Sequence, residues 1–307
     1  MKEIYTLADL QNWDRIADAG SIRLGVIGHP VEHSLSPQMQ NAALKHCKIK
    51  MQYVRLQIST DELGESLKQI RDLDFVGVNL TVPHKIAALV SIDQLDAETK
   101  RIGAVNVIKK EDRKLLGFNT DGRGFSRAIR ELFSVDLRDL RVLVLGAGGG
   151  ARAIAVQCAR ENCERLVIAN RTHEKAKKLA DDLRDLFAGP RVLGPVARLQ
   201  AIAWEENAFR FQIANIDLIV NVTPLGLNRS DTSPIPSRLL APHLMILDTN
   251  YSEQRTPLIS AAVGAGARAA NGLSMLLHQG ALAFELWFDR EAPIEVMRAA
   301  LAGATKG

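Results

Sequence analysis

Short apolar runs alternate with helix-like segments along the chain from Arg23 onward. The runs LGVIG, MQYVRLQI and FVGVNLT each precede a segment with helical character, and two further strand-like runs, GAVNVI and KLLGFN, follow them. Strands that alternate with helices are typical of a parallel α/β sheet. The pattern therefore predicts a first α/β unit that closes near residue 120.

Polar residues after these runs predict where the helices begin. Ser36 is the expected N-cap of the first helix, which puts Pro37 at the first helical position, where its missing N–H costs no hydrogen bond. Ser59 and Glu62 have the spacing of a capping box. Another helix is expected to begin near Pro83.

A second α/β series follows a helix that we expect over residues 123–133. Its strands are expected at residues 141–146, 165–170, 217–222 and 244–250. After the Asn271-Gly272 turn, the stretch LSMLLHQGALAFELW carries apolar residues on more than one helical face, which is typical of a buried helix. We expect this helix to return to the first unit and to make it discontinuous. The predicted segments are 1–121, 122–271 and 272–307.

Composition narrows the possible classes of function. A chain of 307 residues with 47% hydrophobic residues can bury two cores of ordinary domain size. The net charge of +4 is small and aromatic residues make up 5%, so a small anionic ligand fits better than a nucleic acid. No apolar run reaches the roughly 18 residues of a membrane span, and the N-terminal segment has no signal-peptide core. We expect a cytoplasmic protein that binds neither nucleic acid nor membrane.

The spacing of cysteine and histidine residues predicts no metal site. Cys47, Cys158 and Cys163 form no CxxC pair, and no two histidines have zinc-ligand spacing. We expect the three thiols to be reduced and structural.

The segment GAGGGA is the sharpest local signal for a cofactor. It runs from Gly146 to Ala151 between the apolar strand RVLVL and a helical segment. In that context the pattern GxGxxG/A predicts a dinucleotide-binding turn in preference to a purely structural glycine turn. Gly146 permits the tight turn, Gly148 lets the backbone approach a pyrophosphate, and Ala151 allows close packing of helix on sheet. The helix start at Gly149 and Gly150 supplies N–H donors to the phosphates.

The end of the second strand of this series favours NADP over NAD. NAD sites place a carboxylate there, about 20 residues after the glycine turn, to hold the ribose hydroxyls. This chain instead has Asn170-Arg171-Thr172, so no carboxylate repels a 2′-phosphate. The planar guanidinium of Arg171 suits a phosphate, and Lys175 adds a second positive charge one helical turn later.

Polar side chains also mark strand ends and helix starts of the first unit. Ser34 and Ser36 are two residues apart in a stretch expected to be extended, so their hydroxyls could share a carboxylate, with helix capping as the alternative role of Ser36. Asn79 and Thr81 share one face of a predicted strand. Lys85, just inside the helix near Pro83, is a candidate for proton transfer.

These segments, in this order, resemble the shikimate dehydrogenase family. The matching patterns are GHPVEHSLSP, GVNLTVPHK, GAVNVI, GFNTDG, GAGGGA, NRT, NVTPLG, DTNYSEQRTPL and NGLSMLLHQG, which cover nearly the whole chain from residue 23. The resemblance implies an α/β protein with a Rossmann-type NADP domain and a discontinuous α/β substrate domain with a mainly parallel sheet. Its cleft would lie between the two halves.

The resemblance also implies roles for individual residues. Lys85 and Asp121 would form the catalytic pair, in which Lys85 exchanges a proton with the reacting oxygen and Asp121 holds the lysine and ring hydroxyls. The substrate site would comprise Ser34, Ser36, Thr81 and Tyr251 at the carboxylate, and Asn79, Asn106 and Gln279 at the ring hydroxyls. The cofactor site would comprise Gly146, Gly148, Gly149, Gly150, Ala151, Asn170, Arg171, Thr172, Lys175, Thr223 and Gly272.

The implied reaction is the reversible NADPH-dependent reduction of 3-dehydroshikimate to shikimate, in the pathway to aromatic amino acids. A quinate or aminoshikimate dehydrogenase on the same scaffold is the close alternative, although quinate-using relatives tend to alter the hydroxyl at the position of Ser36. A non-catalytic NADP-binding sensor is an alternative from another class, but a sensor needs neither Lys85 nor Asp121. The sequence leaves both a monomer and a homodimer open.

Overall fold

The chain divides into two compact units. The structure, a computed structural model, describes residues 2–16, 19–188, 197–228, 230–251 and 255–304. The first unit comprises Met1–Gly124 and Leu276–Gly307, and the second comprises Phe125–Met275. Two helices, α6 (Asp121–Phe133) and α11 (Leu273–Phe288), continue from one unit into the other.

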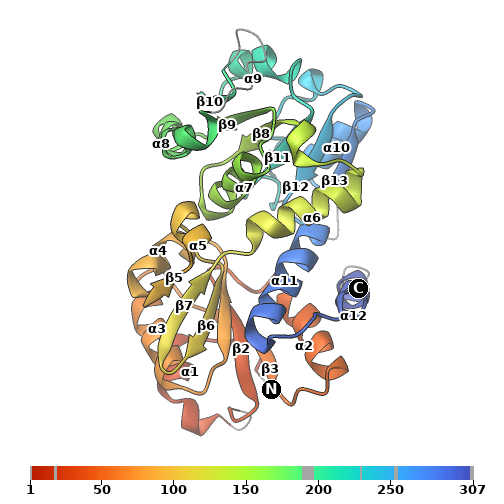
Figure 1. Cartoon of the computed structure of the whole chain (residues 1–307). Coiled ribbons are helices and arrows are strands. Elements are labelled where there is room, and N and C mark those ends of the chain that lie inside the picture. The colour runs from red at the N-terminus through yellow and green to blue at the C-terminus, as the bar shows by residue number, and fades with distance from the viewer. Residues whose placement is uncertain (1, 17–18, 189–196, 229, 252–254, 305–307) are drawn as a thin grey trace. The chain divides into compact units, whose positions relative to one another are not determined.

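The first unit is built on a mainly parallel sheet (Figure 1). In its described part, the strand order is β1-β3-β2-β4-β6-β7-β5. The strands are β1 (Ile4–Tyr5), β2 (Ile22–Gly28), β3 (Gln52–Gln57), β4 (Gly77–Leu80), β5 (Gln94–Leu95), β6 (Val107–Glu111) and β7 (Lys114–Phe118). Strand β6 runs antiparallel to both β4 and β7, and the remaining pairs are parallel. The strand β1, which the sequence pattern did not predict, extends one edge.

Successive strand residues point to opposite faces of this sheet. Apolar side chains lie on both faces, and helices cover each of them. The helices of the unit are α1 (Leu7–Gln11), α2 (Ser36–His46), α3 (Leu63–Asp72), α4 (His84–Ala87), α5 (Ala97–Ile102) and α12 (Ile294–Ala304), with 3₁₀ turns η1 (Trp13–Arg15) and η2 (Ala88–Ser91). One core contains residues of α1 and α3, and the other contains residues of α2, α11 and α12 (Figure 1). In the second core, Leu277, Phe284 and Trp287 of α11 pack with Leu24 and Val26 of β2.

The start of α2 differs from the expected one by a residue. Leu35 occupies the N-cap position with ψ of 2°, and Ser36 is already helical. Ser36 makes no capping bond; instead its backbone N–H donates to Ser34 Oγ at 3.3 Å. The expected N-cap is therefore wrong, because the turn at Leu35 starts the helix early. For the same reason Ser34 and Ser36 do not lie on an extended stretch.

The second unit has the parallel sheet of a Rossmann-type domain. In its described part, the strand order is β10-β9-β8-β11-β12-β13, and every pair is parallel. The strands are β8 (Arg141–Leu145), β9 (Arg165–Ala169), β10 (Leu199–Ile202), β11 (Leu218–Asn221), β12 (Met245–Asp248) and β13 (Arg268–Asn271). The helices are α7 (Gly149–Arg160), α8 (His173–Leu183), α9 (Glu206–Ile213) and α10 (Pro257–Gly264), with 3₁₀ turns η3 (Leu137–Asp139), η4 (Arg184–Phe187) and η5 (Ser237–Leu239).

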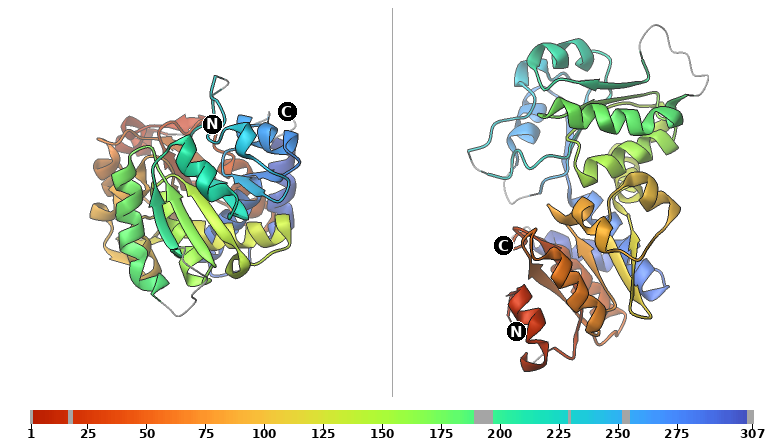
Figure 2. Two further views of the ribbon diagram at one scale, coloured as in Figure 1. Left: turned by 90° about the horizontal axis from the view of Figure 1, so that it is seen from above. Right: turned by 90° about the vertical axis from the view of Figure 1, so that its left-hand side faces the viewer.

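Helices cover both faces of the second sheet as well (Figure 2). Residues of α9 and α10 share a core with alternate residues of β8, β9, β11 and β12, and α7 and α8 lie against the other face. The α/β class with mainly parallel sheets is thus confirmed in both units. Among the described residues, no helix is long and apolar enough to span a membrane.

Candidate active site

Lys85 and Asp121 form a partly buried ion pair in the first unit. Lys85 lies in the short helix α4, and Asp121 is the first residue of α6, directly after the loop that follows β7. Lys85 Nζ is 2.6 Å from Asp121 Oδ2, and the two side chains are 18% and 5% exposed. An ammonium group held by a buried carboxylate, with part of its surface open, can exchange a proton with a bound ligand.

Hydrogen bonds fix both members of the pair. The second oxygen of Asp121, Oδ1, accepts from Asn106 Nδ2 at 2.9 Å. The backbone N–H of Asp121 donates to Asn119 Oδ1 at 3.0 Å, and the carbonyl of Lys85 accepts from Val105 N at 2.7 Å. Because each carboxylate oxygen of Asp121 has its own donor, the Lys85 ammonium is held in one place.

Asn106 is the centre of the polar cluster around this pair. Besides Asp121, its Nδ2 lies 3.0 Å from Thr120 Oγ1 and 3.2 Å from Gln279 Oε1. Its Oδ1 accepts from Thr120 N at 2.8 Å. Gln279 belongs to α11, and its Nε2 donates to Leu276 O at 2.9 Å. The structure thus brings Gln279 into the same cluster as Asn106 and Asp121, although more than half the chain separates them.

Asn79 and Thr81 lie at the end of β4, next to this cluster. Asn79 is buried, and its Nδ2 donates to the carbonyl of Asn106 at 3.0 Å. Thr81 follows the strand, is half-buried, and its backbone N–H donates to Ile27 O at 2.9 Å. Both side chains therefore lie at the carboxyl end of β4, where loops of a parallel sheet commonly bind ligands.

The two serines lie at the start of α2. Ser36 is buried and Ser34 is half-buried. The carbonyl of Ser34 accepts from Arg55 Nη2 at 2.7 Å and from Arg55 Nε at 3.2 Å. Tyr251, by contrast, follows β12 and belongs to the second unit, whereas the other six predicted substrate residues belong to the first.

Three residues of the cluster are not among the site residues predicted from the sequence. Asn119 holds the backbone of Asp121, Thr120 holds Asn106, and the hydroxyl of Tyr53 donates to Asn79 Oδ1 at 2.7 Å. Asn119 and Thr120 lie inside the segment FNTDG, so the segment itself could have pointed to them. Nothing in the local sequence of β3 marks Tyr53.

The glycine segment of the second unit forms a strand–turn–helix. Strand β8 ends at Leu145, Gly146 adopts φ of 119°, and α7 begins at Gly149 with Gly148 as N-cap. The N–H groups of the first helical turn have no partner within the helix and point toward its start. Ala151 is fully buried, which allows the close helix packing that the pattern predicts. These features suit a pyrophosphate at the start of α7.

The space around two predicted cofactor glycines distinguishes a ligand position from a packing position. A Cβ placed on Gly148 would meet nothing within 4 Å, whereas a Cβ on Gly272 would lie 2.1 Å from the backbone oxygen of Thr249. We therefore expect Gly148→Ala to keep the thermal unfolding midpoint and to weaken NADP binding. Gly272→Ala should instead lower the unfolding midpoint. Calorimetry of both variants with and without NADP checks this, and a strong loss of stability in Gly148→Ala would contradict the ligand position.

The segment after β9 is open and basic. Asn170 Nδ2 donates to Thr172 O at 2.9 Å, and α8 begins at His173 with Thr172 as N-cap. Arg171 and Lys175 are both exposed. In the described part of the chain neither forms an ion pair, so both cations are available to an anionic ligand. This arrangement fits a 2′-phosphate better than a free ribose diol.

A buried network joins the ends of β11 and β12. Asp248 accepts from Thr256 Oγ1 at 2.6 Å, from Asn221 Nδ2 at 2.9 Å and from Asn250 N at 3.2 Å. Asn221 Oδ1 in turn accepts from Thr223 Oγ1 at 2.7 Å and Thr223 N at 3.1 Å. Burial raises the pKa of Asp248 above its ordinary value. The network fixes the loop that carries the predicted cofactor residue Thr223.

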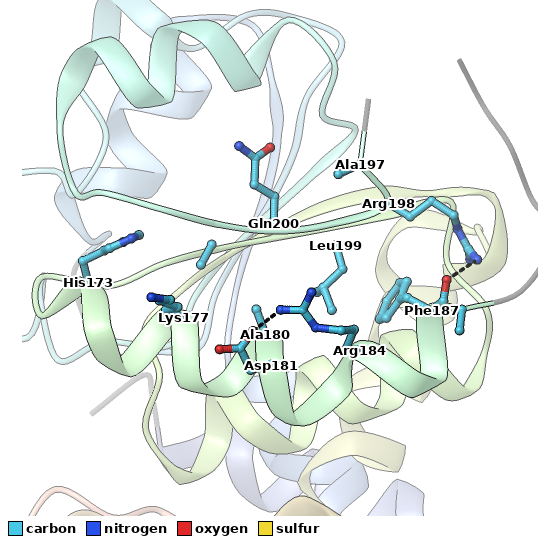
Figure 3. Close-up of a pocket in the computed structure, with 12 residues that line it drawn as sticks. His173, Lys177, Ala180, Asp181, Arg184, Phe187, Ala197, Arg198, Leu199 and Gln200 are labelled. Atoms are coloured by element: carbon cyan, nitrogen blue, oxygen red, sulfur yellow. Dashed lines mark hydrogen bonds and ion pairs between the residues drawn. The ribbon is translucent and has the colours of Figure 1, made fainter. Parts of the chain in front are cut away.

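A groove of about 580 Å³ lies elsewhere on the second unit, between α8 and β10 (Figure 3). His173, Lys177 and Arg184 line its α8 side, and Arg184 is paired with Asp181. None of the predicted site residues lines this groove. It is therefore not part of the candidate site.

His84, next to Lys85, is fully buried and anchors α4. Its Nε2 lies 2.8 Å from the carbonyl of Ile58, and burial lowers its pKa below the ordinary value of 6.5. The unfolded chain therefore binds a proton at a higher pH than the folded chain does. We expect the free energy of unfolding to fall as the pH drops below about 6.5, by at most about 1.4 kcal/mol per pH unit from this residue. Urea unfolding across pH checks this, and a His84→Gln variant with an unchanged slope would contradict it.

Family models match three parts of the chain. Residues 26–108 match the shikimate dehydrogenase substrate binding domain, residues 127–190 match shikimate / quinate 5-dehydrogenase, and residues 272–302 match the shikimate 5′-dehydrogenase C-terminal domain. The three matches include the segments of Lys85, the glycine turn and Gln279.

Full-length relatives agree with these matches. The chain is 41% identical to the shikimate dehydrogenase (NADP+) of Methanopyrus kandleri, over 92% of this chain and 96% of that protein. It is similar to a shikimate dehydrogenase crystallised with NADP+, with a TM-score of 0.83, 34% identity, and coverage of 94% and 98%. The Thermus thermophilus enzyme in complex with NADP(H) and shikimate has a TM-score of 0.78, 34% identity, and coverage of 92% and 99%. The chain belongs to the shikimate dehydrogenase family.

Proposed function

We propose that this protein is an NADP-dependent shikimate dehydrogenase, which reversibly reduces 3-dehydroshikimate to shikimate. The observation that carries the proposal is the Lys85–Asp121 pair, with Nζ and Oδ2 2.6 Å apart inside a cluster of amide side chains. A dehydrogenase for a polyhydroxylated ring needs a proton donor beside several hydrogen-bonding groups. The family relatives that bind NADP and shikimate support the same function.

The proton chemistry follows from the geometry of the pair. NADPH, when bound, supplies the hydride that reduces the substrate ketone. As negative charge develops on the carbonyl oxygen, Lys85 donates a proton to it, and Asp121 keeps the ammonium oriented by accepting its hydrogen bond. In the reverse direction the neutral amine of Lys85 accepts the hydroxyl proton.

We assign substrate binding to the first unit and NADP binding to the second. Asn79, Asn106 and Gln279 would bind the ring hydroxyls, and Ser34, Ser36 and Thr81, which all belong to the first unit, would hold the carboxylate. Because carboxylate binding needs donors, the hydroxyls of these residues are suited to it. The role of Tyr251 stays a prediction from the family resemblance. On the cofactor side, the pyrophosphate would lie at Gly146–Ala151 and the 2′-phosphate at Asn170–Thr172 with Lys175, while Thr223 completes the site. Gly272, which was also predicted there, has no room for a Cβ beside Thr249, and this fits a packing role.

Quinate dehydrogenase on the same scaffold is the second candidate. One matching family model covers both shikimate and quinate enzymes, so this match fits either substrate. The family resemblance speaks against quinate, because quinate-using relatives tend to alter the hydroxyl at the position where this chain has Ser36. A non-catalytic sensor is disfavoured, because it would have no use for the Lys85–Asp121 ion pair.

A matrix assay tests the proposal. Initial rates of shikimate and of quinate oxidation are measured with NADP and with NAD by the absorbance of reduced nicotinamide. We expect kcat/KM to be highest for shikimate with NADP. A higher value for quinate would favour the second candidate, and no turnover with any of the four combinations would overturn the assignment as a dehydrogenase of these acids.

The three cysteines, all free in the structure, support the proposal that the protein works in a reducing compartment such as the cytoplasm.

A further inference from the structure

A buried tyrosine lies behind the predicted substrate residues of the first unit. Tyr53 belongs to β3, is almost fully buried, and its hydroxyl is 2.7 Å from Asn79 Oδ1. A buried phenol that donates a hydrogen bond to the side-chain amide of a binding residue can fix the orientation of that amide. Any other orientation would leave a buried polar atom without a hydrogen bond, which is energetically costly.

Asn41 and Trp287 hold Tyr53 in place. Asn41 of α2 accepts from Tyr53 N and donates to Tyr53 O, both at 2.8 Å. The Tyr53 ring packs against Trp287 of α11 with ring centroids 6.1 Å apart. Trp287 is itself fixed, because its indole N–H donates to Ile108 O at 3.0 Å. The hydroxyl of Tyr53 therefore has a defined position in the core.

The hydrogen bonds determine which way the Asn79 amide faces. A backbone carbonyl can only accept, so the Asn79 atom 3.0 Å from Asn106 O must be the donor Nδ2. Oδ1 then faces Tyr53, and the phenol must donate to it. One N–H of Asn79 remains unused by these two bonds, and it is the group that Asn79 can offer to a hydroxyl or keto oxygen of a ligand.

The same bonds connect Tyr53 to the catalytic pair. Asn79 bonds to the backbone of Asn106, and the side chain of Asn106 donates to Asp121 at 2.9 Å. Tyr53 does not touch Asp121 or Lys85. Loss of its hydroxyl should therefore disturb the orientation of Asn79 first, and the proton donor much less.

We propose that Tyr53 is a positioning residue for substrate recognition, which locks the Asn79 amide so that its free N–H is presented to an oxygen on the substrate ring. The inference rests on the proposed function, in which Asn79 contacts a ring hydroxyl. Without the phenol, Oδ1 of Asn79 would lose its buried donor, and the amide could turn away from the orientation that serves the substrate.

Tyr53→Phe tests this proposal, because it removes only the hydroxyl. We expect the KM for shikimate to rise about 10-fold, while kcat and the KM for NADP stay within about two-fold of wild type. Asn79→Ala should raise the KM at least as much. In the double variant the two effects should not add, since Tyr53 acts through Asn79.

Tyr5→Phe is the matched control, because it removes the hydroxyl of another buried tyrosine in the same sheet, whose ring packs on Trp13 of η1. Its KM for shikimate should stay near that of wild type, and unfolding midpoints of all variants separate loss of stability from loss of binding. An unchanged KM in Tyr53→Phe, additive effects in the double variant, or an equal rise of the KM in Tyr5→Phe would each overturn the inference while shikimate turnover by the wild type still stands. If Asn79→Ala leaves the KM unchanged, the inference is also overturned. Absence of shikimate turnover by the wild type would instead overturn the proposed function, and the inference with it.

Discussion

Lys85→Ala is expected to lower kcat for shikimate oxidation by roughly 100-fold or more, with a modest change in substrate affinity. In the direction of shikimate oxidation, the amine of Lys85, whose Nζ is held 2.6 Å from Asp121 Oδ2, accepts the hydroxyl proton, and alanine can accept none. Because transfer of the hydride to NADP must be accompanied by loss of this proton, water must take the place of the amine. Steady-state kinetics with saturating NADP measures the loss.

Two controls accompany this variant. Lys100→Ala removes an exposed lysine of α5 in the same unit and should leave kcat unchanged. Unfolding midpoints show whether Lys85→Ala still folds, since removal of the lysine leaves the buried Asp121 with Asn106 as its side-chain partner. Unchanged turnover by a folded Lys85→Ala protein would remove Lys85 from the mechanism.

Arg171→Ala is expected to raise the KM for NADP by about 10- to 100-fold and to leave the KM for NAD nearly unchanged. Arg171 is exposed at the end of β9, where NAD enzymes carry a carboxylate for the ribose. The rise in KM should be confined to NADP, because only NADP carries the 2′-phosphate. KM values for both cofactors, at a fixed saturating shikimate concentration, give the comparison.

Lys178→Ala is the matched control for this prediction. It removes an exposed cation of α8, the helix that follows Arg171, and it is not among the predicted cofactor residues. Its KM for NADP should stay near the wild-type value at physiological ionic strength, where distant surface charges are screened. Equal rises of the KM for NADP and for NAD in Arg171→Ala would refute the proposal that Arg171 binds the 2′-phosphate.

Much of the fold could be predicted because its strongest signals are local. The glycine turn lies between an apolar strand and a helix, so Gly146 to Ala151 could be placed from sequence alone. The central strands β8, β9, β11 and β12 are continuous apolar runs, as buried parallel strands require. Both features are determined by residues that are adjacent in the sequence, so they can be predicted without knowledge of the fold.

The strands that were missed lie at sheet edges. Strand β10 reads LQAI and β13 reads RAAN, and neither contains the run of β-branched residues that marks a central strand. The two-residue strands β1 and β5 are too short to give any pattern. Pairing with β9, β12, β3 and β7 makes these segments strands, and such pairing cannot be predicted from a short segment by itself.

The candidate site depends on contacts between distant parts of the chain. Lys85 and Asp121 could be joined before the structure only through the family resemblance, because no local spacing connects them. The bond between Asn106 and Gln279 likewise joins β6 and its loop to the last long helix. Tyr53 was missed because its partner Asn79 lies in another strand, and a buried tyrosine in β3 reads as an ordinary core residue.

Transfer of deuterium from cofactor to product tests the central claim most directly. The wild-type protein is incubated with 3-dehydroshikimate and NADPH doubly deuterated at C4 of the nicotinamide, and the product is examined by mass spectrometry. The proposed function predicts shikimate that carries one deuterium at the carbon of the former ketone. Recovery of unreduced 3-dehydroshikimate, or of shikimate without deuterium, would contradict it.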